Sequence, residues 1–132
     1  MSDFMVNCQK LIDEGNHLAL RVTLEENLPE GMMITDLVNS EGKSLLHMCT
    51  FKNNQKCFNA VIRAVKTMYK DREDFAFTLR SWVNQKTFQD EFSALHYSSY
   101  RGNIEISQSL IDLGADIKIK NQYGLDVLHI AA

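Results

Sequence analysis

The stretch 93–99, Ser-Ala-Leu-His-Tyr-Ser-Ser, decides the fold because its pattern occurs twice more in the chain. An earlier copy reads Ser-Leu-Leu-His-Met-Cys-Thr at 44–50, and a later one reads Asp-Val-Leu-His-Ile-Ala-Ala at 126–132. Each copy has a helix-capping residue, then a leucine and a histidine, and then small side chains. A pattern that recurs in this way predicts a molecule built from stacked copies of one structural unit.

Each copy predicts the start of a short helix. Ser44, Ser93 and Asp126 stand at the helix start, where a side-chain oxygen accepts the free backbone N–H three residues on. That third residue is always the histidine, whose imidazole can bond back to the capping residue as in a capping box. The leucine and the small residue three positions after it share one helix face, so the next helix can approach that face closely.

A second helix is expected to return after each first one. Asn and Gly tolerate the left-handed backbone that ends a helix, so the first helices should stop at Asn53-Asn54 and at Gly102-Asn103. Apolar side chains then recur at helical spacing over 58–68 and over 104–113. The return helix over 58–68 is expected to be the longer of the two.

The N-terminal residues repeat this layout without its signature. A helical stripe stops at Gly15-Asn16, and leucines at helical spacing continue up to Pro29. We interpret this segment as a capping helix pair. An insertion is expected between Tyr69 and Val83, containing an extra helical turn packed by Trp82.

The three copies resemble the T-P-L-H-x-A-A signature of ankyrin repeats, with Leu45, Ala94 or Val127 in place of the proline. Leu95 and Leu128 are 33 residues apart, which is the ankyrin period. The resemblance implies an all-α ankyrin repeat solenoid of stacked helix-turn-helix units, with an insertion between the second and third repeats. The expected segments are an N-terminal capping helix pair (1–37), an ankyrin repeat (38–69), an insertion and hairpin start (70–86), an ankyrin repeat (87–119) and the start of a truncated repeat (120–132).

Composition excludes several classes of function. The 132 residues are 45% hydrophobic, and 14 basic side chains against 17 acidic ones give a net charge of −3, so no nucleic-acid partner is expected. Three cysteines without a C-x-x-C pair predict neither a disulfide framework nor a zinc site. No signal peptide or apolar run of membrane-spanning length occurs. These features predict a cytoplasmic location and no direct membrane insertion. Because the fourth repeat lacks its return helix, we expect regions outside this chain, through which the protein could be tethered to a membrane or an assembly.

No catalytic, cofactor or metal site is predicted. Gly42-Lys43-Ser44 resembles the end of a phosphate-binding loop, but Leu37 stands where that motif needs glycine. Histidines that recur at the repeat period form a row with a spacing of about 10 Å, whereas ligands of one metal ion must converge. The motifs of hydrolases, redox enzymes and zinc proteases are absent from the sequence. We therefore expect this segment not to be an enzyme, and to hold no cofactor and no metal.

The ankyrin resemblance implies a binding surface at the hairpin tips and at the two residues before the turn that closes each first helix. In this sequence Ser40, Glu41, Lys43 and Leu125 belong to such tips. The partner-binding residues that the resemblance implies are Phe51, Lys52, Phe88, Gln89, Phe92, Tyr100, Arg101, Gln122 and Tyr123. Aromatic residues and arginine dominate binding hot spots. The alternative that Phe88 and Phe92 simply pack the hairpins together stays open. The hairpin at 87–92 is one residue longer than the family pattern and lacks its glycine, so its shape does not follow from the resemblance.

Two functions follow from these features. The first is a protein–protein interaction module that binds a protein partner through its concave ankyrin surface, as part of a longer protein or an assembly. The second rests on the strings at 92–103 and 121–132, which look like the ankyrin region of DHHC-type palmitoyltransferases of protists. In that family the ankyrin repeats recruit substrate, and a cysteine-rich segment that these 132 residues do not contain performs acyl transfer.

Overall fold

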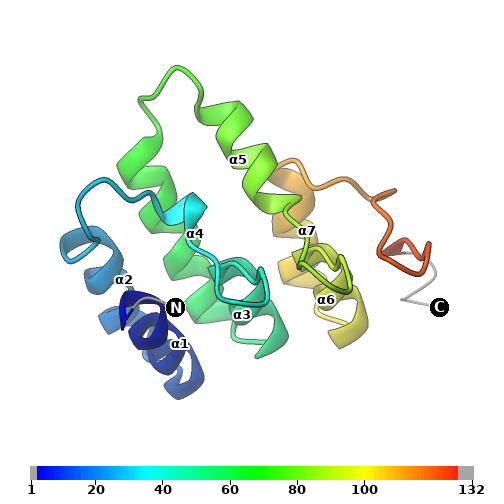
Figure 1. The fold of residues 1–132 in the computed structure, drawn as a ribbon, viewed down its shortest axis with the longest axis horizontal. Helices are drawn as coiled ribbons and strands as arrows, with labels where there is room; N and C mark the ends of the chain where they lie inside the picture. Colours follow the sequence, from blue (N-terminus) through cyan, green and yellow to red (C-terminus); the bar gives the residue numbers. More distant parts are fainter. Residues whose placement is uncertain (1–2, 128–132) are drawn as a thin grey trace.

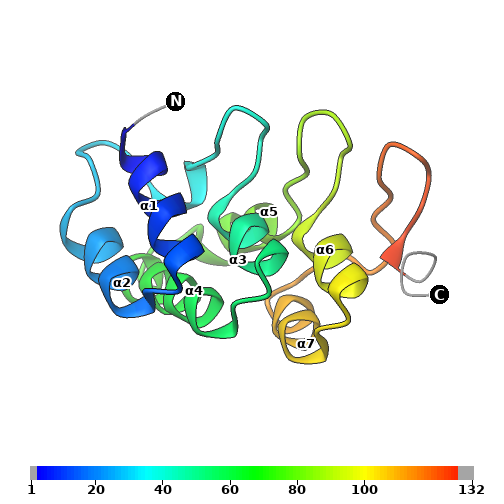
Figure 2. The same ribbon diagram turned by 90° about the horizontal axis from the view of Figure 1, so that it is seen from below.

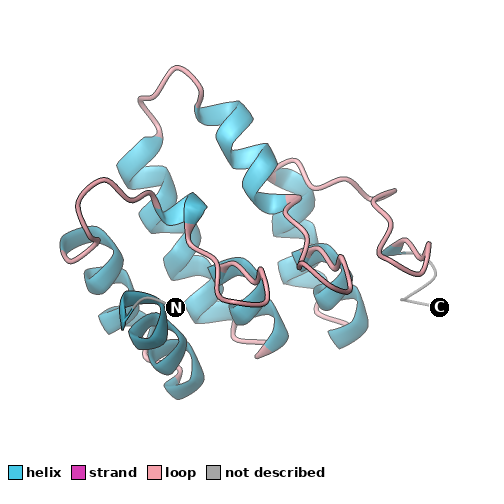
Figure 3. Cartoon of the chain, viewed as in Figure 1, coloured by secondary structure: helices cyan, strands magenta, loops and turns pink. Residues whose placement is uncertain are grey.

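The structure is a computed structural model that describes residues 3–127, and more than half of these residues lie in helices (Figure 1). The elements are α1 (Asp3–Glu14), α2 (His17–Glu26), the 3-10 turn η1 (Ile34–Asp36), α3 (Leu45–Phe51), α4 (Gln55–Tyr69), α5 (Phe75–Val83), α6 (Ala94–Arg101) and α7 (Ile104–Asp112). Residues 3–127 form no β-strand, and an isolated bridge joins Val38 to Ser44 (Figure 3). The predicted all-α class is confirmed.

The helices form antiparallel pairs stacked side by side. In Figure 2, α1, α3 and α6 make one layer, α2, α4 and α7 make a second layer, and hairpins project from the first layer, away from the second. This is the arrangement of stacked helix-turn-helix units that the repeated pattern predicts. The predicted copy at 126–132 lies largely outside the described residues, and so does its histidine, His129.

The predicted helix ends are confirmed. Asn53 (φ 56°) and Gly102 (φ 71°) adopt the left-handed conformation just after α3 and α6. The next residue along the chain then caps the return helix. The side chain of Asn54 accepts from the N–H of Cys57, and that of Asn103 accepts from the N–H of Ile106. In each pair, Asn53-Asn54 and Gly102-Asn103, the first residue therefore ends one helix and the second caps the next.

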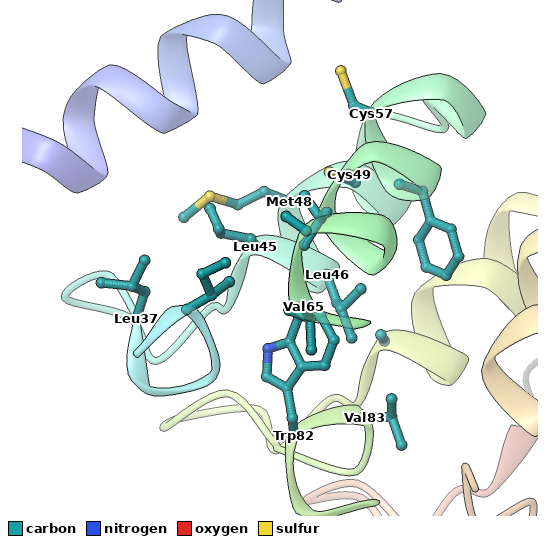
Figure 4. Packing of buried hydrophobic residues seen from close by; sticks show 14 of the residues in the cluster. Leu37, Leu45, Leu46, Met48, Cys49, Cys57, Val65, Trp82 and Val83 are labelled. Carbon is teal, nitrogen blue, oxygen red and sulfur yellow. The ribbon is translucent and has the colours of Figure 1, made fainter. Parts of the chain in front are cut away.

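The leucines of the repeated pattern form the centre of the core. Leu46 and Leu95 are buried, and the small side chains of Cys49 and Ser98 on the same helices are also buried, where the helix pairs pack together. Figure 4 shows this packing at close range, with Leu46 of α3 beside Val65 of α4. Complete burial of a leucine contributes roughly 1.5–3 kcal/mol to stability, so these positions bear much of the fold's stability.

Two buried histidines, His47 and His96, each join their own repeat to the hairpin of the next one. In each capping box the imidazole Nδ1 accepts the N–H of the capping serine at 3.0 Å, for His47 from Ser44 and for His96 from Ser93. A neutral imidazole that accepts at Nδ1 carries its proton on Nε2. The Nε2–H of His47 therefore donates to the carbonyl of Phe92 at 2.8 Å, and that of His96 donates to the carbonyl of Leu125 at 3.0 Å. Each histidine thus holds the hairpin of the following repeat.

The insertion forms a helix of nine residues, α5, which is longer than the single turn expected from the sequence. Its buried Trp82 and Val83 belong to the same core cluster as α3 and α4, as the spacing predicts (Figure 4). Asn84 follows α5, donates to the carbonyl of Gly114 at 3.0 Å and accepts the N–H of Asp116 at 2.8 Å. The insertion is therefore fixed to the turn that follows α7.

Candidate partner-binding site

Three hairpins project from the helix layer of α3 and α6, and each is closed by its own first residue. Asn39 and Asn121 each accept two backbone N–H groups through the side-chain oxygen, at 2.9–3.0 Å. In the middle hairpin Thr87 takes this place, and its hydroxyl accepts the N–H of Phe92 at 3.1 Å. Glu91 (φ 57°) adopts the left-handed conformation there, where the outer hairpins have Gly42 and Gly124. Glu91 therefore takes the left-handed position that glycine occupies in the other two hairpins, and the middle hairpin is still closed by its hydrogen bond.

Two hollows lie between these hairpins, and together we call them the hairpin groove. The α3 hollow, of about 400 Å³, lies between hairpins 39–43 and 87–92. The α6 hollow, of about 360 Å³, lies between hairpins 87–92 and 121–125. Both are lined by Phe51, Phe92 and Tyr97, so they are two halves of one surface that crosses adjacent repeats.

Tyr97 is the centre of the hairpin groove, and its role was missed from the sequence. Its ring lies 5.6 Å from Phe92, 5.7 Å from Phe51 and 5.6 Å from His47, each in an edge-to-face arrangement. Burial, together with the charges of Asp90 and Glu41, raises the pKa of Tyr97 to about 12. The phenol is therefore neutral at ordinary pH. The available signal was its place directly after the histidine, the position that the ankyrin signature leaves variable.

The structure brings most of the predicted binding residues together. Phe51, Phe88, Gln89, Phe92, Tyr100, Arg101 and Tyr123 line the hairpin groove. Lys52 and Gln122 do not line either hollow. The Nζ of Lys52 lies 3.4 Å from the carboxylate of Asp13 on α1, and the N–H of Gln122 donates to the carbonyl of Asp90 at 3.0 Å. Lys52 therefore points to the N-terminal helix pair, and Gln122 helps to hold two hairpins together.

The two phenylalanines of the middle hairpin differ in role. Phe92 is half-buried and packs against His96 and Tyr97, so the packing alternative holds for this residue. Phe88 lies over Gly42, where an added Cβ would come within 2.6 Å of its ring, and yet 66% of the residue is exposed. Phe88 therefore packs the hairpins on one side and presents the other side to the solvent.

The exposed rim of the groove combines aromatic rings with charged side chains. Tyr100 and Tyr123 are 76% and 66% exposed, and Arg101 lies beside them. In the α3 hollow the Nζ of Lys43 lies 5.4 Å from the ring centroid of Phe51, a cation–π distance. Exposed aromatic rings of this kind leave apolar surface that a partner can cover.

The titratable groups of the interior are held neutral. Burial lowers the pKa of His47 to about 4 and also lowers that of His96. Burial raises the pKa of Cys8 to about 11 and raises those of Cys49 and Cys57, and all three are free thiols. Among residues 3–127, no group of three or more His, Cys, Asp or Glu side chains is placed to hold a metal ion. These residues also form no helix with the length and apolarity needed to cross a bilayer.

Comparisons with known proteins agree with this architecture. A model of the ankyrin repeat family matches residues 90–122. The Notch-regulated ankyrin repeat-containing proteins of Homo sapiens and Mus musculus are each 30% identical to the chain over 92 residues, which cover 66% of this chain and 76% of the relative. A chain in the crystal structure of the yeast ribosomal protein Rps3 in complex with its chaperone Yar1 superposes with a TM-score of 0.77 and 22% identity, over 95% of this chain and 80% of that one. At this identity the superposition supports the fold alone.

Proposed function

The chain belongs to the ankyrin repeat family, and from this premise we propose that it is a protein-interaction module whose partner lies in the hairpin groove. The observation that carries the proposal is the exposure of Tyr100 and Tyr123 on adjacent repeats, beside one largely apolar hollow. Neither side chain is needed to bury the repeat interface, because Leu95 and His96 already do so. Large exposed aromatic residues are the side chains that dominate binding energy in protein interfaces.

The shape of the groove favours an extended segment of the partner. The segment would cross from the α6 hollow to the α3 hollow over the shared floor of Tyr97 and Phe92. An apolar or aromatic side chain of the partner would enter the α6 hollow. The guanidinium of Arg101 at its rim would bind a carboxylate or a backbone carbonyl of the same segment.

The relatives support a protein partner in general terms. The matched crystal structure is that of a chaperone with a ribosomal protein, and the matched relatives are named as regulated by Notch. The palmitoyltransferase alternative has no support among these relatives, and no feature of the groove favours it.

The experiment that tests the proposal is a selection of binding peptides followed by mapping. Peptides from a displayed random library are selected on the folded protein, and the backbone amide shifts of the protein are followed during titration with a selected peptide. We expect the largest shifts around Tyr97, Tyr100 and Tyr123. Shifts confined to the outer helices α2, α4 and α7 would contradict the proposal.

A further inference from the structure

The outer surface of the repeat stack carries another hollow, which the hairpin groove does not include. It lies over α4, is bordered by α2 and α7, and has a volume of about 840 Å³. In Figure 2 these three helices lie on the side of the molecule away from the hairpins. A segment bound there would leave the hairpin groove accessible.

Helix α4 gives this outer hollow a row of positive charges. Lys56, Arg63 and Lys66 are exposed and line the hollow, and their spacing of seven and three residues places them on one face of the helix. The 15 residues of α4 include no Asp or Glu. The ion pairs found within residues 3–127 do not involve these three side chains. The row is therefore uncompensated, in a chain whose net charge is −3.

The helices that border the hollow do not neutralise this row. On α2, Arg21 pairs with Glu25 of the same helix at 3.0 Å, so that carboxylate is already engaged. On α7, Asp112 lines the hollow, but its carboxylate accepts from Gln108 of its own helix at 2.9 Å. The three unpaired cations of α4 and the paired Arg21 thus line a hollow to which Asp112 supplies the single carboxylate.

The hollow also offers apolar surface next to the cations. Leu18 of α2 is 70% exposed, and Ile62 of α4 is half-buried between the cationic positions. A ligand that satisfies this surface needs apolar groups as well as negative charge.

We propose that the outer hollow binds an acidic polypeptide segment with apolar side chains between its carboxylates. Lys56 and Arg63 are seven positions apart in the helix, which is about 10 Å along the axis. A segment in the extended polyproline II conformation has three residues per turn, so an acidic residue at every third position repeats its carboxylates on one side at about 9 Å. Its intervening apolar side chains would cover Leu18 and Ile62.

Other polyanions fit the hollow less well. An unbroken row of phosphates would meet the carboxylate of Asp112 inside the hollow, where a polypeptide can place an apolar or amide side chain instead. A flat anionic membrane would reach the ends of Lys56 and Lys66 but not the half-buried Ile62 below them. The charge and the apolar floor together favour the acidic polypeptide.

The test uses a fluorescent synthetic peptide that has glutamate at every third position and leucine and serine between, with a control peptide in which glutamine replaces each glutamate. Binding to the full chain is measured by fluorescence anisotropy at low and at high salt. The variant Lys56→Glu/Arg63→Glu/Lys66→Glu is compared with Lys10→Glu/Lys118→Glu/Lys120→Glu, which changes the net charge equally on exposed residues outside the hollow. The milder Lys56→Gln/Lys66→Gln variant serves if the triple reversal does not fold.

We expect the acidic peptide to bind, the hollow variant to lose about tenfold or more in affinity, and the control variant to keep most of it. Binding should weaken at high salt and should persist in Tyr100→Ala/Tyr123→Ala, so this proposal and the hairpin groove fail independently. No binding of the acidic peptide, equal binding of the glutamine peptide, or equal losses in both charge variants would overturn the proposal. Binding of single-stranded RNA or phosphatidylserine vesicles that depends on Lys56 and Arg63, without binding of the peptide, would also overturn it.

Discussion

Helix α6 has two regions that differ in what surrounds them. Near its start, Leu95 and His96 are buried against the adjacent repeats, and His96 donates to the carbonyl of Leu125. At its end, Tyr100 and Arg101 are exposed beside an apolar hollow. One short helix therefore carries a buried stacking region and an exposed region that packing does not use. Residues at the start of α6 hold the repeats together, and residues at its end are available to a partner.

Substitution in the stacking region should have the largest effect on stability. Leu95→Ala removes a buried side chain and leaves a cavity between repeats, so we expect a loss of roughly 2 to 5 kcal/mol in the free energy of unfolding. Tyr100→Ala, five residues later in the exposed region, should change it by less than about 0.5 kcal/mol. Urea denaturation followed by circular dichroism measures both, and similar losses would remove the distinction between the two regions.

His47, in the repeat that precedes α6, should make the free energy of unfolding depend on pH. Burial lowers the pKa of folded His47 to about 4 from 6.5. The folded state therefore resists protonation, so stability is full above pH 6.5 and is lost as the pH falls toward 4. From this histidine alone we expect a loss of about 2 kcal/mol between neutral pH and about pH 5.

The control for this pH dependence is His47→Gln, which keeps a side chain able to hydrogen-bond and removes the titration. Urea midpoints measured in steps from neutral to acidic pH should fall less steeply for this variant than for the wild type. Parallel curves for the two proteins would show that His47 does not contribute.

The middle hairpin, which borders both hollows, should respond more weakly and in the opposite direction. Glu91 adopts a left-handed conformation (φ 57°) that costs a residue with a side chain roughly 1–2 kcal/mol. Glycine avoids this cost but loses more chain entropy, so Glu91→Gly should stabilise the protein by about 0.5 to 1 kcal/mol. The matched change Gln89→Gly, at a position without a positive φ, should destabilise it. Thermal melting of the two variants measures the sign.

Treatment with a chelator or with a reductant should not change the stability of the protein. The cysteines Cys8, Cys49 and Cys57 are free and buried, and among residues 3–127 no group of three or more His, Cys, Asp or Glu side chains is placed to hold a metal ion. A chelator and a reductant should each leave the melting temperature unchanged. Stoichiometric zinc in the purified protein would contradict this expectation.

Local features of the fold were predictable because their causes lie a few residues apart. Ser44 and His47 form a capping box over three residues, and Asn53 and Gly102 end helices by their own backbone preferences. The repeated leucines predicted the core for the same reason, since each leucine and the small residue three positions after it share one helix face.

Features that depend on how the repeats stack were not predictable. The bond from His47 to the carbonyl of Phe92 spans 45 residues, and the bonds of Asn84 to Gly114 and Asp116 span 30 and 32. The central place of Tyr97 likewise depends on the side-by-side arrangement of two hairpins. The ankyrin resemblance named the exposed rim residues and Phe92 of the floor, but not Tyr97 at the centre of the hairpin groove.

We propose that the exposed side chains of Tyr100, Arg101 and Tyr123 bind the partner and contribute little to the stability of the fold. The most direct measurement compares the affinity of a selected peptide for the wild type, for Tyr100→Ala/Arg101→Ala/Tyr123→Ala and for the control Phe77→Ala/Ile104→Ala/Lys118→Ala. The control removes two exposed apolar side chains and one exposed cation elsewhere. We predict that all three proteins melt alike, and that the groove variant alone loses about thirtyfold or more in affinity, which corresponds to about 2 kcal/mol. Unchanged affinity in the groove variant, or an equal loss in the control, would contradict the claim.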